Sequence, residues 1–139
     1  MMPCSKHVTT VAAGLLLIAL LASAQQPTGS PPEPPEHIVS GARVFIAKMD
    51  GFEDYLAAAI QAKQVPLVVV TDKDKADFLI NGFASDNTIQ HHTRATMKVV
   101  NKSGVVVFAY AFDQNYALHG KQTAAEACAK NLKKEIMRH

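Results

Sequence analysis

A strand, a helix and a second strand follow one another within residues 43–70, and this succession constrains the fold most strongly. Residues 43–48 combine β-branched and aromatic side chains, and residues 67–70 are an apolar run typical of a buried strand. A connection of this length predicts two parallel strands joined by a right-handed crossover. The segment between them has one apolar stripe at helical spacing, formed by Phe52, Tyr55, Leu56, Ala59 and Ile60.

Two four-residue patterns predict where helices begin. Asp50-Gly-Phe-Glu53 and Thr123-Ala-Ala-Glu126 both have the form of a capping box, in which two side chains accept hydrogen bonds from each other's backbone N–H groups. The first helix should end before Pro66, because proline disfavours helical backbone in the preceding residue. The second helix has its own apolar stripe, formed by Ala125, Cys128, Ala129, Leu132 and Ile136.

Three more strands are expected between these helices. Residues 76–85 and 94–100 alternate, and residues 105–112 are apolar on both faces after a hairpin loop that ends at Gly104. In the first of these strands Phe78, Ile80 and Ala84 share a face with Gly82. In the second, Ala95, Met97 and Val99 should point inward and Arg94, Thr96 and Lys98 outward. The predicted fold class is therefore α+β: a single two-layer domain, β-α-β-β-β-β-α, with a mixed five-stranded sheet in the order 2-1-3-4-5. Both helices should lie on one face.

Residues 1–24 read as a secretory signal peptide, with Lys6, an apolar run over residues 11–22 and an Ala-Ser-Ala cleavage site. Retention as a membrane anchor is the alternative, although a spanning helix needs about 20 apolar residues. Residues 25–36 contain five prolines and should form an extended tether. Residues 37–139 then form the α+β domain, and the expected location is the periplasm or the outside of the cell.

The composition without residues 1–24 bears on nucleic-acid binding and on disulfide bonds. Removing residues 1–24 removes one of the 14 basic residues and none of the 12 acidic ones, which leaves a net charge of 13 − 12 = +1. This balance gives no electrostatic reason to expect nucleic acid as a partner. Cys128 is the one cysteine that remains, so the core must stabilise the domain without an intrachain disulfide.

No group of residues predicts catalysis or a cofactor. His91, His92 and His119, with Asp86 nearby, could supply zinc ligands, but adjacent histidines in an extended chain point to opposite sides. Three aspartates at positions 72, 74 and 77 resemble the start of a calcium loop, but the later ligands of that loop are missing. Cys128, Tyr55, Phe52 and Met97 are expected in the core by their positions. We therefore expect neither an enzyme nor a metal site.

Two short motifs resemble known envelope proteins. Residues 76–82, Ala-Asp-Phe-Leu-Ile-Asn-Gly, are similar to an "Ala-Asp-aromatic-aliphatic-aliphatic-x-Gly" strand, and residues 99–108 are similar to the hairpin that accompanies it. Both occur in curli-secretion lipoproteins, in lipoprotein activators of penicillin-binding proteins and in the amino-terminal domain of the Tol-Pal propeller protein. The resemblance covers roughly residues 43–137 and implies a binding or assembly module. Unlike many of those proteins, this chain has no lipid-accepting cysteine after its apolar run.

The last strand offers a candidate docking surface, because a sheet with one uncovered face normally has polar residues there. Either Val105, Val107, Ala109 and Ala111 or the alternate residues of the strand should face the uncovered side. The predicted protein-docking patch is Val106, Phe108, Tyr110, Phe112, Arg94, Thr96 and Lys98. The function expected is non-catalytic binding of another envelope or secreted protein, or of a second copy, through the sheet face or edge. The alternative is a small metal- or ligand-binding enzyme that uses the His91, His92 and His119 loops.

Overall fold

The computed structural model describes residues 33, 35–87, 89–115 and 119–139. The predicted signal peptide at residues 1–24 and most of the predicted tether lie outside the described residues. In the part of the chain that the structure describes, no helix has the length and apolarity needed to cross a membrane.

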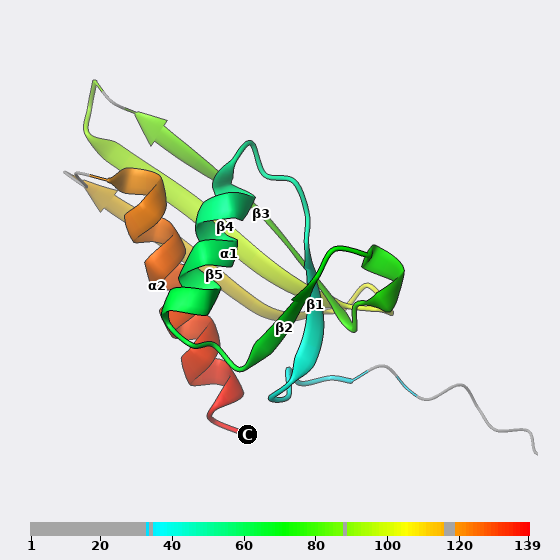
Figure 1. The fold of residues 1–139 in the computed structure, drawn as a ribbon. Helices are drawn as coiled ribbons and strands as arrows, with labels where there is room; N and C mark the ends of the chain where they lie inside the picture. The colour runs from blue at the N-terminus through cyan, green and yellow to red at the C-terminus, as the bar shows by residue number, and fades with distance from the viewer. Residues whose placement is uncertain (1–32, 34, 88, 116–118) are drawn as a thin grey trace, which may run out of the picture. The chain divides into compact units, whose positions relative to one another are not determined.

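Five strands and two α-helices follow one another in the predicted order, with a short 3₁₀ turn between the second and third strands (Figure 1). The elements are β1 (Ala42–Ile46), α1 (Phe52–Ala62), β2 (Leu67–Val70), η1 (Lys73–Lys75), β3 (Phe78–Asn87), β4 (His92–Asn101), β5 (Val106–Asn115) and α2 (Gly120–Ile136). The sheet has the order β2-β1-β3-β4-β5. Both the predicted α+β class and the predicted strand order are confirmed.

The sheet is parallel at one side and antiparallel at the other. β1 pairs in parallel with both β2 and β3, whereas β3, β4 and β5 form an antiparallel meander of ten-residue strands. Register partners lie side by side on the same face, so Ile80, Val99 and Phe108 share one face. Both helices pack against that face, which we call the covered face, and the opposite side is the open face (Figure 1).

The core lies between the helices and the covered face. Its large, fully buried side chains come from both layers: Phe52, Leu56, Ile60 and Leu132 from the helices, and Val44, Phe78, Ile80, Met97 and Val99 from the strands. Removing each of these side chains from water stabilises the fold by roughly 1.5–3 kcal/mol. The predicted α2 stripe and the inward alternation of β4 are confirmed, as is the α1 stripe apart from Tyr55.

Two side-chain assignments need correction. Tyr55 was expected in the core but is 46% exposed, because it lies at the border of the α1 stripe and faces the flank of α2. β2 was expected to be buried, yet Val68 and Val69 are 50% and 37% exposed. β2 is an edge strand, so no further strand covers its outer side.

The start of α1 follows only half of the predicted capping box. The Glu53 carboxylate accepts hydrogen bonds from the backbone N–H groups of Met49 and Gly51, at 2.8 and 2.9 Å. These bonds, that from Met49 foremost, lower the pKa of Glu53. Asp50 makes no side-chain cap, because Gly51 occupies the N-cap position in the left-handed region, at φ 84°.

The predicted start of α2 is wrong by one turn. The helix begins at Gly120, and Thr123 donates its backbone N–H to His119 as an ordinary helical residue. Glu126 instead forms an ion pair with Lys63 of the α1 C-cap, at 2.8 Å. Glycine explains this early start, since a Cβ atom at Gly120 would lie 2.0 Å from Oγ1 of Thr93. The first residue of α2 therefore rests directly on the sheet.

His37, near the start of the described domain, lies beside its last residue, His139. The His37 and His139 rings stack with their centroids 4.7 Å apart. Pro35 contacts the β4–β5 hairpin, where its carbonyl accepts a hydrogen bond from Nδ2 of Asn101 at 3.3 Å. The two helices are joined near the same end, because Nζ of Lys133 donates to the carbonyl of Lys63 at 2.9 Å.

Asp77 fastens the start of β3 to β1. Its carboxylate accepts hydrogen bonds from the backbone N, Nε and Nη2 of Arg43, at 3.0, 3.3 and 3.0 Å. The backbone N–H of Asp77 donates to the Arg43 carbonyl at 2.7 Å. The guanidinium hydrogen bond is the main reason that the pKa of Asp77 lies below its usual value. This contact gives a structural role to the aspartate of the Ala-Asp-aromatic motif.

We predict that Gly120→Ala destabilises the domain by about 1–3 kcal/mol, the usual cost of overpacking. At an ordinary helical glycine, replacement by alanine would stabilise the domain, because alanine has the higher helix propensity. Denaturant unfolding of the single variants and of the Gly120→Ala/Thr93→Ala double variant measures this. The double variant should lose less free energy of unfolding than the two single variants lose together, because Thr93 is the nearest obstruction to a Cβ atom at position 120. An increase in stability for Gly120→Ala would contradict the packing described here.

We predict that Asp77→Asn lowers the unfolding midpoint at pH 7 and that the difference from the natural protein disappears in acid. A carboxylate with a depressed folded-state pKa adds stability above its unfolded pKa of about 3.9, and this is lost as the pH falls through the folded value. Thermal unfolding between pH 7 and pH 2.5 tests the sign. Asp74→Asn is the matched control, because Asp74 is exposed and forms no ion pair with a described residue. A difference independent of pH would exclude the Asp77 charge as the cause.

Candidate protein-docking face

An unbroken line of apolar side chains crosses the open face of the sheet. The strand registers place one residue from each strand in the line, and we call it the open-face row: Val70, Phe45, Leu79, Val100 and Val106. Val106 is 50% exposed and the other four are half-buried. No helix of the described domain packs on this side. An uncovered antiparallel face is ordinarily polar, so this row is unusual for a solvent-facing surface.

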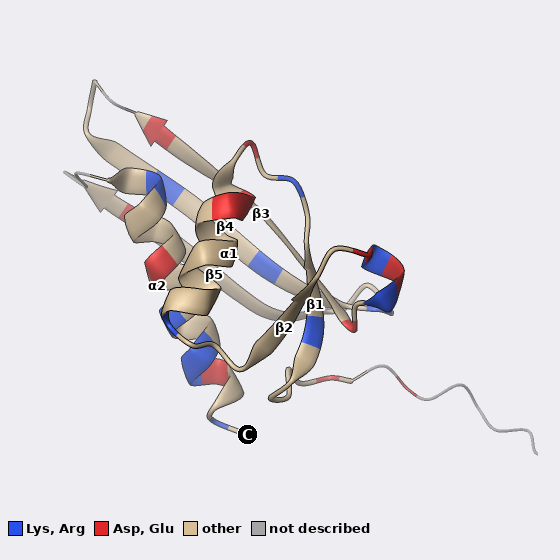
Figure 2. Cartoon of the chain, viewed as in Figure 1, with Lys and Arg blue, Asp and Glu red and all other residues tan. Residues whose placement is uncertain are grey.

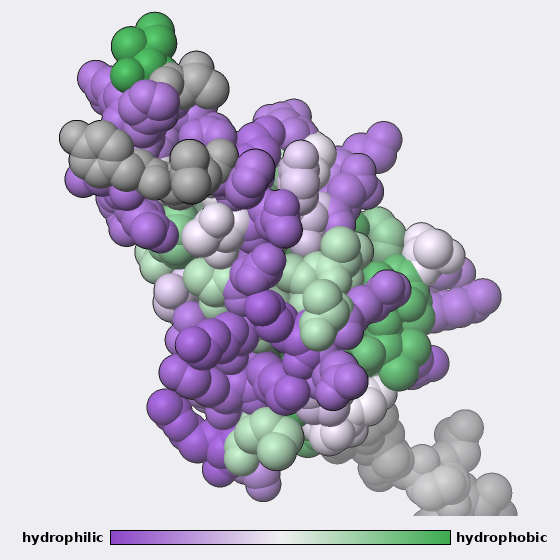
Figure 3. Space-filling model, turned by 60° about the vertical axis from the view of Figure 1, so that its left-hand side comes forward, coloured by the Kyte–Doolittle hydropathy of each residue, from purple (hydrophilic) through white to green (hydrophobic). Residues whose placement is uncertain are grey.

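Exposed apolar residues extend the row. Phe83 lies on the same face of β3 and is 52% exposed, and Val68 of β2 is 50% exposed. Figure 3 shows green apolar atoms gathered on the right-hand side of the molecule, among otherwise hydrophilic residues. The apolar surface therefore includes the β2 edge as well as the middle of the sheet.

A hollow of about 500 Å³ opens beside the row. Its lining includes Leu79 and Val100 of the row, with Phe78 alongside. Charges of both signs line this hollow: Lys73 and Asp74 from η1, Asp77, and Lys102 from the β4–β5 loop. This volume lies within the range of about 300–1,000 Å³ that accommodates small ligands or a protruding side chain.

Charges of both signs lie near the row, and Figure 2 shows acidic and basic residues together at the turn that follows β2. Arg43 is neutralised by Asp77, at 3.0 Å. Lys73, Lys98 and Lys102 form no ion pair with any described residue. Lys98 is on β4, directly beside Asn81 and Ala109 on the open face. The surface therefore combines apolar side chains with unpaired ammonium groups.

The predicted docking patch is divided between the two faces. Arg94, Thr96, Lys98 and Val106 lie on the open face, as expected. Phe108, Tyr110 and Phe112 lie on the covered face beside Val99, Met97 and Ala95, where they pack against the core and remain half-buried. The prediction that all seven residues share one surface is wrong. Protein binding by any of them remains a prediction.

A β-bulge explains this error. Val99 pairs with Phe108 but Val100 pairs with Val106, so Val107 is an extra residue in β5. An extra residue reverses the alternation, which puts Val106 and Phe108 on opposite faces although they are two positions apart. In the alternative set, Ala109 and Ala111 do reach the open face, whereas Val107 packs against the core.

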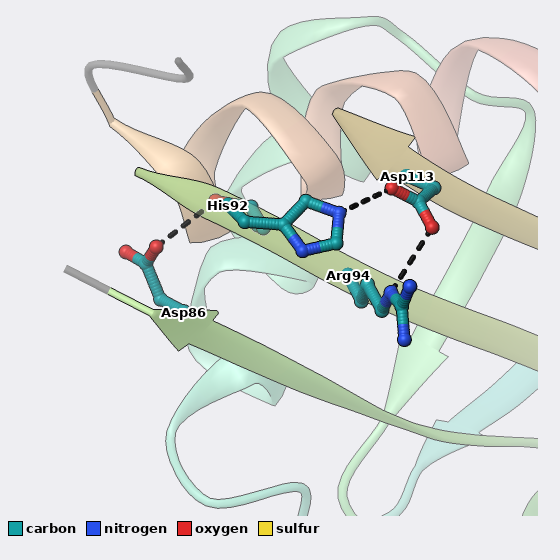
Figure 4. A network of polar contacts seen from close by, with 5 residues as sticks. Asp86, His92, Arg94 and Asp113 are labelled. Atoms are coloured by element: carbon teal, nitrogen blue, oxygen red, sulfur yellow. Dashed lines mark hydrogen bonds and ion pairs between the residues drawn. The ribbon is translucent and has the colours of Figure 1, made fainter. Parts of the chain in front are cut away.

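A polar network marks the other end of the open face (Figure 4). Asp113 of β5 contacts Nε2 of His92 through one carboxylate oxygen, and accepts from Nε of Arg94 at 3.0 Å through the other. The hydrogen bond with His92 is the main reason that the pKa of Asp113 is lowered. Asp86 accepts from Oγ1 of the buried Thr93 at 3.0 Å on the opposite side of β4. His92 and Arg94 share the Asp113 carboxylate, and Asp86 and Thr93 form a separate pair.

The structure brings only part of the candidate metal site together, because Asp86 and His119 line one hollow. His92 is engaged by Asp113, His119 is the N-cap residue of α2, and His91 has a left-handed backbone at φ 49°. Among the residues that the structure describes, no three His, Cys, Asp or Glu side chains are close enough to hold a metal ion. Of the aspartates near η1, Asp72 accepts from the backbone N–H of Asp74, and Asp77 is bound to Arg43.

Cys128 is a core residue, as its position on the α2 stripe predicts. The side chain is fully buried, and burial raises the pKa of its thiol to about 12. A thiol protonated at physiological pH is a poor nucleophile.

Sequence reasoning missed most of the open-face row. The sequence pattern predicts a buried strand for residues 67–70, which include Val70, and assigns no outward face to Phe45 or Leu79. A signal was present, because β1 and β2 are apolar at consecutive positions while only two helices are available to cover the sheet. Val100 belongs to the predicted strand at residues 94–100, but the sequence pattern did not predict which side of the sheet its side chain occupies.

A comparison with protein-family models finds no match for this chain, and a search of curated proteins finds none either. Among solved structures, TolB from Acinetobacter baumannii aligns with a TM-score of 0.54 and 3% sequence identity. The alignment covers 70% of this chain, and the chain spans only 29% of the TolB structure. The Protein Y N-terminal domain of Thermus thermophilus aligns over 69% of this chain and 98% of its own, at 12% identity, but its TM-score of 0.32 supports no argument.

The likeness to TolB concerns the fold alone. It agrees with the resemblance to the amino-terminal domain of the Tol-Pal propeller protein at the level of architecture. The particular families named in that resemblance are not confirmed. The chain is therefore an α+β domain whose fold is similar to part of TolB.

Proposed function

We propose that this protein is an exported, non-catalytic binding module of the bacterial envelope, and that its open face holds an acidic, amphipathic segment of another envelope or secreted protein. The single observation that carries the proposal is the open-face row, which crosses all five strands without cover from the described domain. The fold-level likeness to TolB supports a bacterial envelope setting.

The row and the hollow together have the form of a protein-binding surface. A partner's apolar side chain would enter the hollow beside Leu79 and Val100, and neighbouring apolar residues would cover the row. Interfaces obtain most of their binding energy from a few anchors in such desolvated pockets, with a polar rim around them. A protein segment fits this arrangement better than a small metabolite, because the apolar line extends well beyond the hollow.

The unpaired lysines determine the chemistry of the partner. Lys73, Lys98 and Lys102 form no ion pair among the described residues, and Asp77 is held by Arg43, which lowers its pKa most, with a further lowering from the charge of Lys102. Aspartate or glutamate residues in the bound segment would complete these pairs and fix its register. A nucleic acid is not part of this proposal, because the mature chain carries little net charge. No stable membrane anchor is proposed once the leader has been removed.

We predict that exchanges on the open face weaken partner binding without unfolding the domain. Phe83→Ser and Lys98→Glu alter exposed side chains, so the fold should survive. Each should reduce affinity for a partner captured from envelope extract by about tenfold, the effect of losing one contact worth about 1.4 kcal/mol. Interferometry with the purified partner measures the change, and higher salt should weaken the natural pair more than the Lys98→Glu pair.

Lys130→Ala is the matched control, since Lys130 is an exposed residue of α2 on the opposite side of the molecule. It should bind as the natural protein does. A partner whose affinity is equal for all these variants occupies some other surface and would refute the open-face assignment. Chemical-shift changes centred on α2 would do the same.

The metal-dependent alternative gives a separate prediction. We expect the purified protein to contain no stoichiometric zinc or other transition metal, because its described histidines are not gathered around one point. Elemental analysis after purification without chelators measures this content. A stoichiometric metal that is lost in His91→Ala and His119→Ala variants would favour the enzyme hypothesis over the binding module.

A further inference from the structure

β5 is a long sheet edge without the usual protection. It spans ten residues at one end of the strand order. Natural edge strands commonly carry lysine or proline, which discourage pairing with another chain. Val106–Asn115 contains neither, and its one charged residue, Asp113, is occupied by His92 and Arg94. Within the described residues, no backbone group of β5 bonds to an element other than β4.

The aromatic residues of β5 leave the core incomplete at this edge. Phe108, Tyr110 and Phe112 are half-buried, whereas their neighbours on β4 are fully buried: Val99, Met97 and Ala95. The difference arises because β5 has no further strand on its outer side. A strand added there would cover the exposed sides of the rings and so extend the buried layer on the covered face.

The sequence of this edge is symmetric. Residues 108–112 read Phe-Ala-Tyr-Ala-Phe, and reversing their order gives the same residues. In an antiparallel pair centred on Tyr110, Phe108 lies opposite Phe112 of a second copy. Tyr110 lies opposite Tyr110 of that copy. Ala109 then lies opposite Ala111 of the second copy. Aromatic rings meet rings on the covered face, and small residues meet small residues on the open face, which is the self-complementarity that a two-fold interface requires.

We infer that β5 is a homotypic interface, through which two copies of this chain pair edge to edge about a two-fold axis at Tyr110. The result is one continuous ten-stranded sheet in which the helices of both copies lie on the same side. The charges permit this register, because the two Asp113 residues lie on opposite sides of the axis and so do not face each other. The inference concerns the β5 edge and does not depend on the open-face docking proposal.

The helices leave room for this pairing. α2 contacts β3, β4 and β5, so it is centred near β4. In the paired sheet, the two β4 strands are three strand spacings apart, or about 14 Å. This separation exceeds the diameter of about 10–12 Å of a helix with its side chains, so the two α2 helices can lie side by side.

Solution mass and a charge exchange test the interface. Sedimentation equilibrium of the purified protein at micromolar concentrations should give twice the monomer mass. The Ala109→Lys/Ala111→Lys variant should dissociate at least tenfold more readily, because lysines then face lysines across the edge. Both alanines are exposed in the monomer, so its fold should be retained, which circular dichroism verifies. A mixture of this variant with Ala109→Glu/Ala111→Glu should recover a heterodimer.

A cysteine at the symmetry axis tests the register itself. Directly opposed residues of an antiparallel pair have Cα atoms about 4.5–5.5 Å apart, within the range that a disulfide spans. Tyr110→Cys should therefore form a covalent dimer under mild oxidation, whereas Ser103→Cys in the β4–β5 loop should not.

Three results would overturn the inference: a folded monomer at every concentration, a dimer unaffected by the lysine pair, or equal cross-linking at both cysteine positions. Lys98→Glu should remain dimeric. Loss of dimer in that variant would instead place the contact on the open face, which separates this inference from the docking proposal.

Discussion

Two helices of 11 and 17 residues cover one face of a five-stranded sheet, and this one-sided packing is the constraint on which the structure depends. The largest buried side chains, among them Phe52, Phe78 and Met97, all lie in the single layer between helices and sheet. Without a disulfide among the described residues, the stability of the domain must come largely from this layer. Its position also leaves the opposite face and the β5 edge available for contact with other molecules.

The sequence predicted the features that depend on local periodicity. Alternation placed Ala95, Met97 and Val99 in the core, and helical spacing placed Leu56 and Leu132 there, because burial on one face determines each pattern. The strand order followed from the parallel βαβ unit and the antiparallel meander that continues from it.

The errors arose where tertiary packing decides the outcome. The start of α2 depends on the close approach of Gly120 to Thr93, two residues that are distant in sequence. The division of the predicted patch depends on the bulge at Val107, because one additional residue exchanges the faces of a strand that is apolar on both sides. The exposure of Val68 depends on the edge position of β2. None of these relations has a signal in residue spacing alone.

The stacking of His37 on His139 has a consequence for the connectivity of the domain. Since His37 lies beside His139, a short peptide could join these two positions, and new termini could be opened in the exposed turn at residues 102–104. The same proximity would allow the whole unit to be grafted into a loop of a host protein with little strain at the junctions. The architecture therefore suits circular permutation and domain insertion, because the order of the sheet does not require the two ends to be apart.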